Sequence, residues 1–343
     1  MIAVALALSL MDTPKTEVRP FEMALNPVKK SPLRFTEKNI PFEFEWMTEG
    51  LAQAWSASPE PQLRFRVFAQ DRKVHGELSP LVTRTLLRLW TYNYNELKID
   101  HKPDYARSCV DVYLCWSGQP GGEHLFDEDP QAPRGGSSKV NTIYIYDLPT
   151  FKEKIEQLRE VAHEYGHATL PAIGGYDYPE YWANGFLGEK LFLSALCNLK
   201  DYDSEQMMGV TQAECQAWVR EKARPLMFKA AQTFPNAEMF KGKGESAMNQ
   251  YIGYLLWVQF CFEPKIVSRL MKINGEKAST LPTTLRECLE DVISTNIPIH
   301  KELQGKLIWL PDLPGTWSGC TIKLRKKGFV GMVPTSETIR LRP

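Results

Sequence analysis

Two histidines four residues apart are the side chains of this sequence best suited to chemistry. They are His163 and His167, in the stretch Val161–Ala168, and Glu164 directly follows the first of them. In a helix, residues four apart lie one above the other on one face, so both imidazoles can reach a single ion. Glu164 is then turned to the side, where it can hold a water bound to that ion and take its proton. The chain has only 6 histidines, so chance produces this H-E-x-x-H spacing in about one per cent of such sequences. The motif therefore predicts a zinc hydrolase.

The residues around the motif predict a long amphipathic helix that ends shortly after the second histidine. Thr150 is expected to cap its start, and Glu153, three residues later, to complete a capping box. The proline and glycines of 171–175 are expected to stop it. The alternative is that the histidines only pack or face solvent, which leaves the neighbouring glutamate unexplained. Between the expected start and end of the helix, a buried stripe is predicted at helical spacing. It is made of Ile155, Leu158, Ala162, Tyr165 and Thr169.

The third ligand of such a site is expected to be a carboxylate. Catalytic zinc usually takes three protein ligands and leaves one position to water. No histidine follows His167 until His300, so a glutamate of the next helix is the natural substitute, as in His2Glu sites. Glu189 is the first choice, because it lies among apolar neighbours, where an unpaired carboxylate is costly. Glu180 and Asp177 remain alternatives, although solvent exposure or helix capping also explains them.

The sequence before the motif alternates between strands and a helix. Strands are predicted at 63–68, 110–116 and 141–146, and a helix at 79–97. Residues 118–138 contain two clusters of proline and glycine and are predicted to form a long loop. The strand at 141–146 ends just before the motif helix, so its edge could pair with an extended peptide and hold it across the metal. An ordinary sheet strand without a substrate role explains the same residues.

The sequence after the motif is mostly helical and then changes to short strands. Helices are predicted at 178–199, 211–220, 224–232, 247–262, 266–273 and 285–293, and strands at 306–310, 320–324 and 338–341. The expected fold class is α+β, with a mixed N-terminal sheet, the motif helix, a mostly helical C-terminal part and a small β appendage. The expected divisions are a signal or leader (1–20), an irregular segment (21–60), a sheet-bearing part with the motif helix (61–170), a helical part (171–304) and the β appendage (305–343).

Composition limits the classes of partner and compartment. Lysine plus arginine and aspartate plus glutamate number 41 each, and this balance argues against nucleic acid as a partner. The apolar run Met1–Leu10 could belong to a secretory signal, which would make the protein secreted or periplasmic. An apolar strand or a misassigned start explains that run equally well, and the protein would then be cytoplasmic. No segment is long enough to span a membrane. The 7 cysteines show neither C-x-x-C spacing nor a clear disulfide framework.

A strand, then the H-E-x-x-H helix, then a second helix opening with Trp182 resembles the gluzincin branch of zinc metallopeptidases. This peptidase MA-like group includes thermolysin and the aminopeptidases. The resemblance covers roughly 63–263 and is specific at the motif. It implies a zincin-like fold, with 61–170 as the upper and 171–304 as the lower subdomain. Family members often read W-x-x-E-G at the second helix, with that glutamate as a zinc ligand. Here Trp182-Ala183-Asn184-Gly185 has no glutamate at that place, so either Glu189 supplies the ligand from a later turn or the site is altered.

The resemblance also implies a side chain that stabilises the oxyanion from a later helix. Residues 249–256 resemble that helix of the family, which makes Tyr251 or Tyr254 the candidate. An aromatic pair in an apolar helix is also typical of a protein core.

The function expected from these features is zinc-dependent peptide hydrolysis. Zinc and Glu164 would activate a water, and Glu164 would pass its proton to the leaving amine. The expected partner is a peptide or protein substrate; its sequence preference, the choice between endo- and exopeptidase and the oligomeric state stay open. One alternative is a degenerate metallopeptidase fold that binds a partner without cleaving it. A purely structural zinc is least compatible, because structural sites are usually rich in cysteine and no cysteine lies near the motif.

Overall fold

The computed structural model describes residues 23–24, 46–52, 62–69, 77–101, 109–115, 120–128, 138–177, 180–275, 277–289 and 291–343. The expected leader (1–20) and most of the expected irregular segment (21–60) lie outside these residues. So do Trp116, at the end of an expected strand, and two parts of the expected loop at 118–138.

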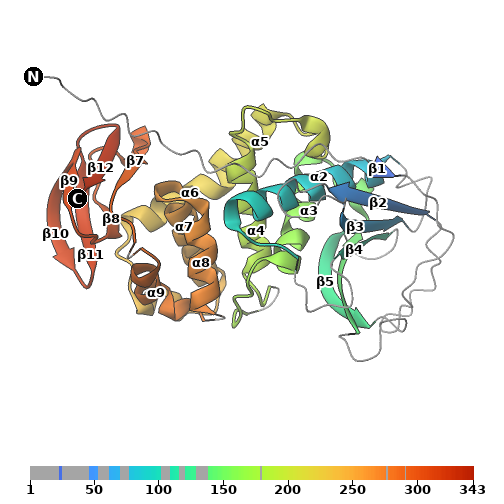
Figure 1. The fold of residues 1–343 in the computed structure, drawn as a ribbon, viewed down its shortest axis with the longest axis horizontal. Coiled ribbons are helices and arrows are strands. Elements are labelled where there is room, and N and C mark those ends of the chain that lie inside the picture. Colours follow the sequence, from blue (N-terminus) through green and yellow to red (C-terminus); the bar gives the residue numbers. More distant parts are fainter. Residues whose placement is uncertain are drawn as a thin grey trace, which may run out of the picture.

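A six-stranded mixed sheet forms one end of the elongated molecule (Figure 1). Its strands β3, β4 and β6 run parallel to one another, and the remaining pairs are antiparallel. The strands predicted at 63–68, 110–116 and 141–146 are therefore confirmed as β3, β4 and β6, as far as they are described. In spatial order the sheet consists of β1 (Met23–Ala24), β2 (Trp46–Ala52), β3 (Gln62–Ala69), β4 (Val110–Cys115), β6 (Lys139–Tyr146) and β5 (Gly121–Glu128).

The two faces of this sheet carry different side chains, because successive residues of a strand point to opposite sides. Val112 and Ile143 belong to the main core, on the face against which α2 (Leu78–Tyr92) and α3 (Lys154–Thr169) pack. The opposite face carries a row of stacked rings. The ring centroids of Phe68 and Tyr113 are 4.8 Å apart, and those of Tyr113 and Tyr144 are 5.2 Å apart. The sheet thus presents its aliphatic face to the helix that carries the motif.

Strand β5 corrects the expectation of a loop at 118–138. It comprises 8 residues, Gly121–Glu128, and pairs antiparallel with β6 along its whole length. Because β6 is paired with both β4 and β5, the strand expected at 141–146 has no free edge. Within the described residues β5 is paired on one side only. The sheet edge that lies beside the motif helix therefore belongs to β5.

The motif helix α3 runs from Lys154 to Thr169 and ends where the sequence predicts. Its start differs from the prediction, since Glu153 stands at the N-cap and makes no side-chain cap bond. Thr150 belongs to the preceding 3-10 turn η2 (Leu148–Thr150), and its Oγ1 donates to the carbonyl of Asp147 at 2.7 Å. The predicted capping box is therefore wrong. The predicted stripe along the helix is confirmed, because four of its members are buried and Ile155 is half-buried.

The centre of the molecule is helical, and each helix predicted there has a counterpart. The α-helices are α4 (Asn184–Leu196), α5 (Gln212–Trp218), α6 (Arg224–Gln232), α7 (Glu245–Cys261), α8 (Pro264–Asn274) and α9 (Leu281–Cys288). Two π-helical segments continue regular helices: η1 (Asn93–Leu97) follows α2, and η4 (Val219–Ala223) joins α5 to α6. Short 3-10 turns are η3 (Ser204–Gln206), η5 (Ala237–Phe240), η6 (Ala278–Thr280) and η7 (Lys301–Leu303).

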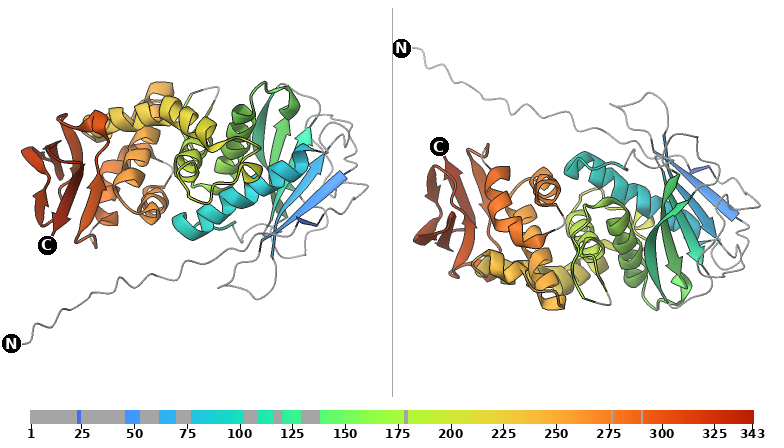
Figure 2. Two further views of the ribbon diagram at one scale, coloured as in Figure 1. Left: turned by 90° about the horizontal axis from the view of Figure 1, so that it is seen from above. Right: turned by 90° about the horizontal axis from the view of Figure 1, so that it is seen from below.

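The C-terminal β unit lies at the end opposite the six-stranded sheet (Figures 1 and 2). It contains two three-stranded antiparallel sheets, β10-β11-β8 and β7-β12-β9. The strands predicted at 306–310, 320–324 and 338–341 are present, whereas β7, β9 and β11 were not expected. Because β7 pairs with β12, β structure begins at Thr295, ahead of residue 305. The strands are β7 (Thr295–Pro298), β8 (Ile308–Pro311), β9 (Thr316–Ser318), β10 (Cys320–Lys326), β11 (Phe329–Pro334) and β12 (Thr338–Arg342).

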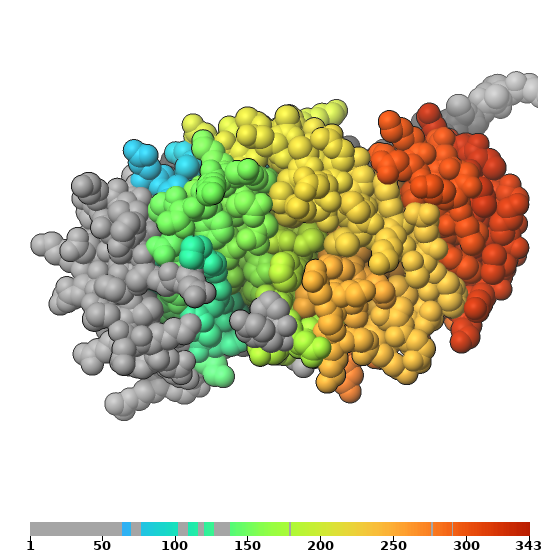
Figure 3. Space-filling model, turned by 180° about the vertical axis from the view of Figure 1, so that it is seen from behind, coloured from blue at the N-terminus to red at the C-terminus, as the bar shows by residue number. Residues whose placement is uncertain are grey.

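Along the long axis of the molecule, the parts of the chain appear at the surface in sequence order: first the motif helix, then the helical centre and then the β unit (Figure 3). The described residues contain both helices and sheets, so the α+β class is confirmed. None of the helices in the described residues has the length and apolar character needed to cross a membrane. All seven cysteines are free thiols; six are buried and Cys320 is half-buried.

Candidate metal centre

Three side-chain atoms converge beside the C-terminal half of α3. The Nε2 atoms of His163 and His167 are 3.1 Å apart. Oε2 of Glu180, from the segment before α4, lies 3.3 Å from Nε2 of His163 and 3.5 Å from Nε2 of His167. The predicted pairing of the two histidines on one helix face is thus observed, and among the described residues these three form the group able to hold a metal ion.

The spacing of the three atoms fits zinc. Ligand atoms bound tetrahedrally at about 2.0–2.1 Å lie about 3.3 Å from one another, and the observed separations are 3.1, 3.3 and 3.5 Å. Two imidazoles and one carboxylate are also a donor set typical of a catalytic zinc site with one position left for water. His163, His167 and Glu180 therefore satisfy both the distance and the chemistry of such a site.

Asn184, at the start of α4, orients His167. Its Oδ1 accepts from Nδ1 of His167 at 3.0 Å, which leaves the Nε2 lone pair directed toward the three-atom group. The amide Nδ2 of Asn184 donates to carbonyls at the C-terminal end of α3, those of His167 at 3.2 Å and Leu170 at 3.3 Å. One buried asparagine thus caps α3 and fixes the tautomer of its second histidine.

Glu189, the expected third ligand, lies on the other side of His163. Its Oε2 is 3.3 Å from Nδ1 of that ring, so it accepts the Nδ1 hydrogen bond and cannot share an ion with Nε2. Arg159 donates to the same oxygen at 3.0 Å, and Lys190 forms an ion pair with Oε1. The carboxylate that apolar neighbours had suggested as a ligand therefore orients the ring of His163 and pairs with two cations. Geometry favours Glu180, one of the two alternatives, while Asp177 is exposed and outside the group.

Carboxylates set the charge state of the group. Burial alone would lower the pKa of His163, but its hydrogen bonds with Glu180 and Glu189 outweigh burial and raise the pKa to about 10. Burial alone would raise the pKa of both glutamates. The hydrogen bonds with His163 and the nearby positive charges nevertheless lower the pKa of each carboxyl to about 2. The negative potential that retains a proton on His163 is the potential that a bound cation requires.

Glycines allow α3 and α4 to approach closely at the site. A Cβ atom added at Gly166, within the motif, would lie 2.5 Å from the carbonyl oxygen of Asn184, and one at Gly188 would lie 2.6 Å from the Cα of Gly166. A Cβ at Gly185 would lie 2.5 Å from Nε2 of His163 and closer still to Nε2 of His167. The space between the two rings is therefore kept open by the absence of a side chain at position 185.

Glu164 points toward the edge strand of the sheet. The residue is 3% exposed, and its Oε2 is buried without a hydrogen-bond partner among the described residues. Burial raises the pKa of this carboxyl to about 8, against the opposing effect of the His163 charge. A Cβ at Gly122 of β5 would lie 2.5–2.6 Å from the Glu164 side chain. The glycine thus lets the main chain of the edge strand pass directly beside this carboxyl group.

A cavity of about 720 Å³ adjoins the centre, and both Glu180 and Glu189 line it. Helix α7 contributes Glu245, Met248 and Asn249 to its wall. Tyr251 and Tyr254, the expected oxyanion candidates on this helix, are instead buried in the core at 0% and 2% exposure, where burial raises the pKa of both phenols well above the ordinary value. Neither tyrosine lines this cavity.

Sequence reasoning missed Asn184, Gly185 and Gly122 as residues that shape the centre. A signal for Gly185 was present, since three glycines in or beside helices, at 166, 185 and 188, are costly unless close packing requires them, whereas Asn184 carried no signal. Gly122 carried no such signal, because it stood within an apparent loop.

Substitution of the two candidate carboxylates separates their roles. We expect Glu180→Gln to weaken zinc binding by more than about 100-fold, beyond the roughly 10–100-fold that loss of an orienting partner costs. Glu189→Gln should show that smaller loss, together with a lower melting temperature of the metal-free protein, because Arg159 and Lys190 lose their buried partner. Competition with a fluorescent chelator and thermal melts measure the two effects. Full retention of zinc by Glu180→Gln and its loss in Glu189→Gln would return the ligand role to Glu189.

The sequence matches none of the known protein families against which it was compared, and it matches no curated protein.

Proposed function

We propose that this chain is a zinc-dependent peptidase of the gluzincin type, with a zincin-like arrangement of sheet, motif helix and helical part. The observation that carries the proposal is the triangle formed by Nε2 of His163, Nε2 of His167 and Oε2 of Glu180, at the separations that tetrahedral zinc needs. The buried carboxyl of Glu164 directly beside it, whose Oε2 has no hydrogen-bond partner among the described residues, is the second support. A structural zinc site would close the fourth position and needs no such carboxyl group.

His163, His167 and Glu180 would hold the ion. When bound, zinc supplies a Lewis acid that polarises a carbonyl and lowers the pKa of a coordinated water. Glu164 supplies the base. Its burial keeps the pKa of the carboxyl near neutrality, which suits a group that takes a proton from water and returns it to the leaving amine. Asn184 and Glu189 hold the two imidazoles in place, so that their Nε2 atoms need no reorientation.

The edge of β5 that pairs with no other described strand offers a place for the substrate backbone. An extended peptide can add to such an edge as a further strand, through main-chain hydrogen bonds. Because Gly122 brings this edge against Glu164, a peptide paired there would carry one of its bonds past the carboxyl group. The cavity lined by Glu180 and Met248 adjoins the metal group and has room for side chains of the substrate.

A second candidate function is a metallopeptidase fold that binds a peptide without cleaving it. It is favoured by the departure at Trp182-Ala183-Asn184-Gly185, where the family pattern has a glutamate ligand and this chain has none. In that case the edge strand and the cavity would still bind an extended peptide.

The proposal is tested by metal analysis and hydrolysis on one preparation. We expect one zinc per chain by elemental mass spectrometry after dialysis, and cleavage of an internally quenched peptide library that a chelator abolishes and zinc restores. Stoichiometric zinc without cleavage of any library member would select the binding function. Absence of bound zinc at micromolar free metal would exclude both.

A further inference from the structure

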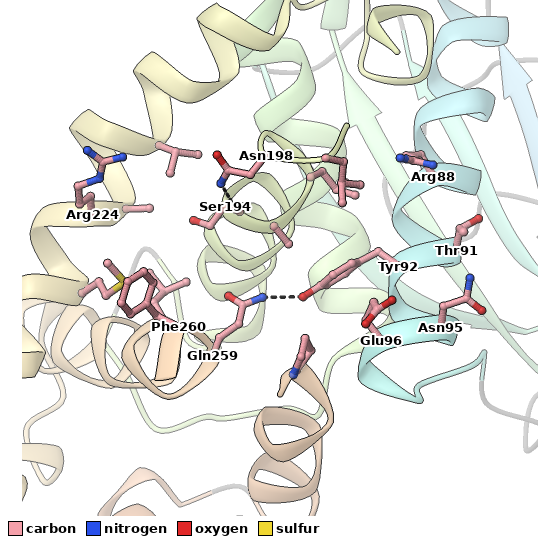
Figure 4. A pocket seen from close by; sticks show the side chains of 18 of the residues that line it. Arg88, Thr91, Tyr92, Asn95, Glu96, Ser194, Asn198, Arg224, Gln259 and Phe260 are labelled. Atoms are coloured by element: carbon pink, nitrogen blue, oxygen red, sulfur yellow. Dashed lines mark hydrogen bonds between the residues drawn. The ribbon is translucent and has the colours of Figure 1, made fainter. Parts of the chain in front are cut away.

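A second cavity, of about 700 Å³, lies between α2, α4, α6 and α7, away from the metal centre (Figure 4). Its volume is within the range of about 300–1,000 Å³ typical of small-molecule sites. Ser194 and Ala195, near the C-terminal end of α4, line it. Gly185 adjoins the metal group nine residues earlier on the same helix, about 14 Å along its axis. The two cavities therefore share a helix but not a wall residue.

Both π-helical segments of the described chain border this cavity. Asn95 and Glu96 of η1 line one side, and Val219 and Ala223 of η4 line another. π-Helical turns account for well under 1% of residues in proteins and occur frequently at functional sites. In η1 the irregular turn leaves Oδ1 of Asn95 buried and without a hydrogen-bond partner among the described residues.

At the opposite side of the cavity two hydrogen-bond donors face each other. Nδ1 of His300 accepts from the backbone N–H of Glu302, at the start of η7. A neutral imidazole has one donor and one acceptor nitrogen, so Nε2 of this ring carries the hydrogen. It lies 3.4 Å from Nη1 of Arg224, which is also a donor. Burial and the charge of Arg224 both lower the pKa of His300, which keeps the ring neutral.

Arg224 has no carboxylate to neutralise it among the residues that the structure describes. The other arginine of the cavity, Arg88, is paired with Asp201 at 3.0 Å, whereas Arg224 forms no ion pair with any residue that the structure describes. Arg224 also lines the adjoining depression, together with the cations Arg220, Lys229 and Lys306 and one carboxylate, Glu302. One oxygen of an anionic group placed between Arg224 and His300 would accept from both donors and resolve their opposition.

We propose that this cavity binds a small organic anion, a carboxylate or a phosphate monoester with an apolar body, whose charged group sits between Arg224 and His300. The apolar body lies against Leu256, Met227 and Phe260, which line the cavity. The hydrogen bond between Gln259 and Tyr92, at 2.6 Å, joins α7 to α2 across the cavity. A ligand of this kind accepts hydrogen bonds from both facing donors, neutralises the charge of Arg224 and packs against the apolar wall.

The test uses three ligands with the same apolar body, namely octanoate, octyl phosphate and octanol. Calorimetric titrations are made on the full chain after dialysis against a chelator, so that anions cannot bind zinc. We expect at least one of the two anions to bind at least about 10-fold more tightly than octanol, the loss expected when a charge-assisted hydrogen bond is absent. Whichever anion binds more tightly identifies the charged group. Inorganic phosphate should bind more weakly than octyl phosphate, because it lacks the apolar body.

Two variants locate the site and one serves as a control. Arg224→Gln should weaken binding of the anion at least about 10-fold and leave octanol unchanged. Ala195→Leu narrows the cavity without changing its charge and should weaken the binding of all three ligands. Arg269→Gln makes the same charge change on α8, where Arg269 is exposed and pairs with Asp291, and should alter none. Failure of both anions to bind, or binding that neither cavity variant weakens, overturns the proposal. The readout involves no catalysis, so such a failure leaves the proposed peptidase activity untouched.

Discussion

Peptide hydrolysis is expected to fall by at least about 100-fold in Glu164→Gln, with zinc content unchanged. Positioned acid–base groups contribute roughly 10²–10⁴ to rate, and the amide of glutamine cannot take a proton from water. Glu164 is not one of the three converging donor atoms, so the metal should stay. The decrease should appear in kcat more than in KM, because the carboxyl group acts on the water and not on the bound peptide. Steady-state kinetics and elemental analysis of the same preparation measure both quantities.

The control for this variant is Glu153→Gln, the same chemical change on an exposed residue at the start of α3. It should leave hydrolysis within about two-fold of the unaltered protein, since surface substitutions away from special features have small effects. The folded state of Glu164→Gln should be at least as stable as that of the unaltered protein, because a neutral amide replaces a buried carboxyl whose Oε2 lacks a hydrogen-bond partner among the described residues. Unimpaired hydrolysis in Glu164→Gln would remove Glu164 as the base and with it the proposed mechanism.

The parts of the fold that depend on neighbours along the chain were predictable from the sequence. The motif helix shows a buried stripe at helical spacing and a proline after its last turn, and α3 ends at the predicted place. Helix α6 occupies the predicted residues 224–232. Strands β4 and β6 are rich in β-branched and aromatic residues and were likewise expected. In these segments local preference and burial favour the same structure.

Strand β5 was not predictable for a physical reason. Its sequence begins with two glycines, which are unfavourable in strands, and shows no alternation of apolar and polar residues. Its order comes from pairing with β6, the next strand along the chain. Glycine at position 122 weakens the strand, but only a residue without a side chain can pass so close to Glu164. In the proposed enzyme this close approach is what the site requires.

The third carboxylate shows where local reasoning about the site fails. An apolar neighbourhood correctly indicated that Glu189 needs a partner, but it could not identify that partner. The partners in the structure are Arg159, on α3, and Lys190, which follows Glu189 on α4. Glu180 stands in the segment before α4 and carried no such signal. It reaches the histidines because that segment bridges back on itself, with Gly174 paired to Trp182. Ligand identity thus depends on a loop geometry that periodicity does not encode.

Gly185→Ala is expected to abolish zinc binding while the chain remains folded. The added methyl group would lie 2.5 Å from Nε2 of His163 and closer still to Nε2 of His167, in the space where an ion shared by both rings must sit. Neither ring can turn away without breaking a buried hydrogen bond, to Glu189 in one case and to Asn184 in the other. Elsewhere in a helix the same change stabilises by about 1 kcal/mol; here overpacking should cost about 1–3 kcal/mol instead.

Thermal melts with and without zinc separate loss of the ion from loss of the fold. Saturating zinc raises the melting temperature of any variant that binds it only in the folded state, so the unaltered protein should shift upward and Gly185→Ala should not. Gly244→Ala is the matched control, because a Cβ there meets no atom within 4 Å; its zinc-dependent shift should equal that of the unaltered protein. If Gly185→Ala kept that shift in full, the ion would not lie between the two imidazoles. The open space at position 185 would then need another explanation, and the peptidase proposal would lose its metal centre.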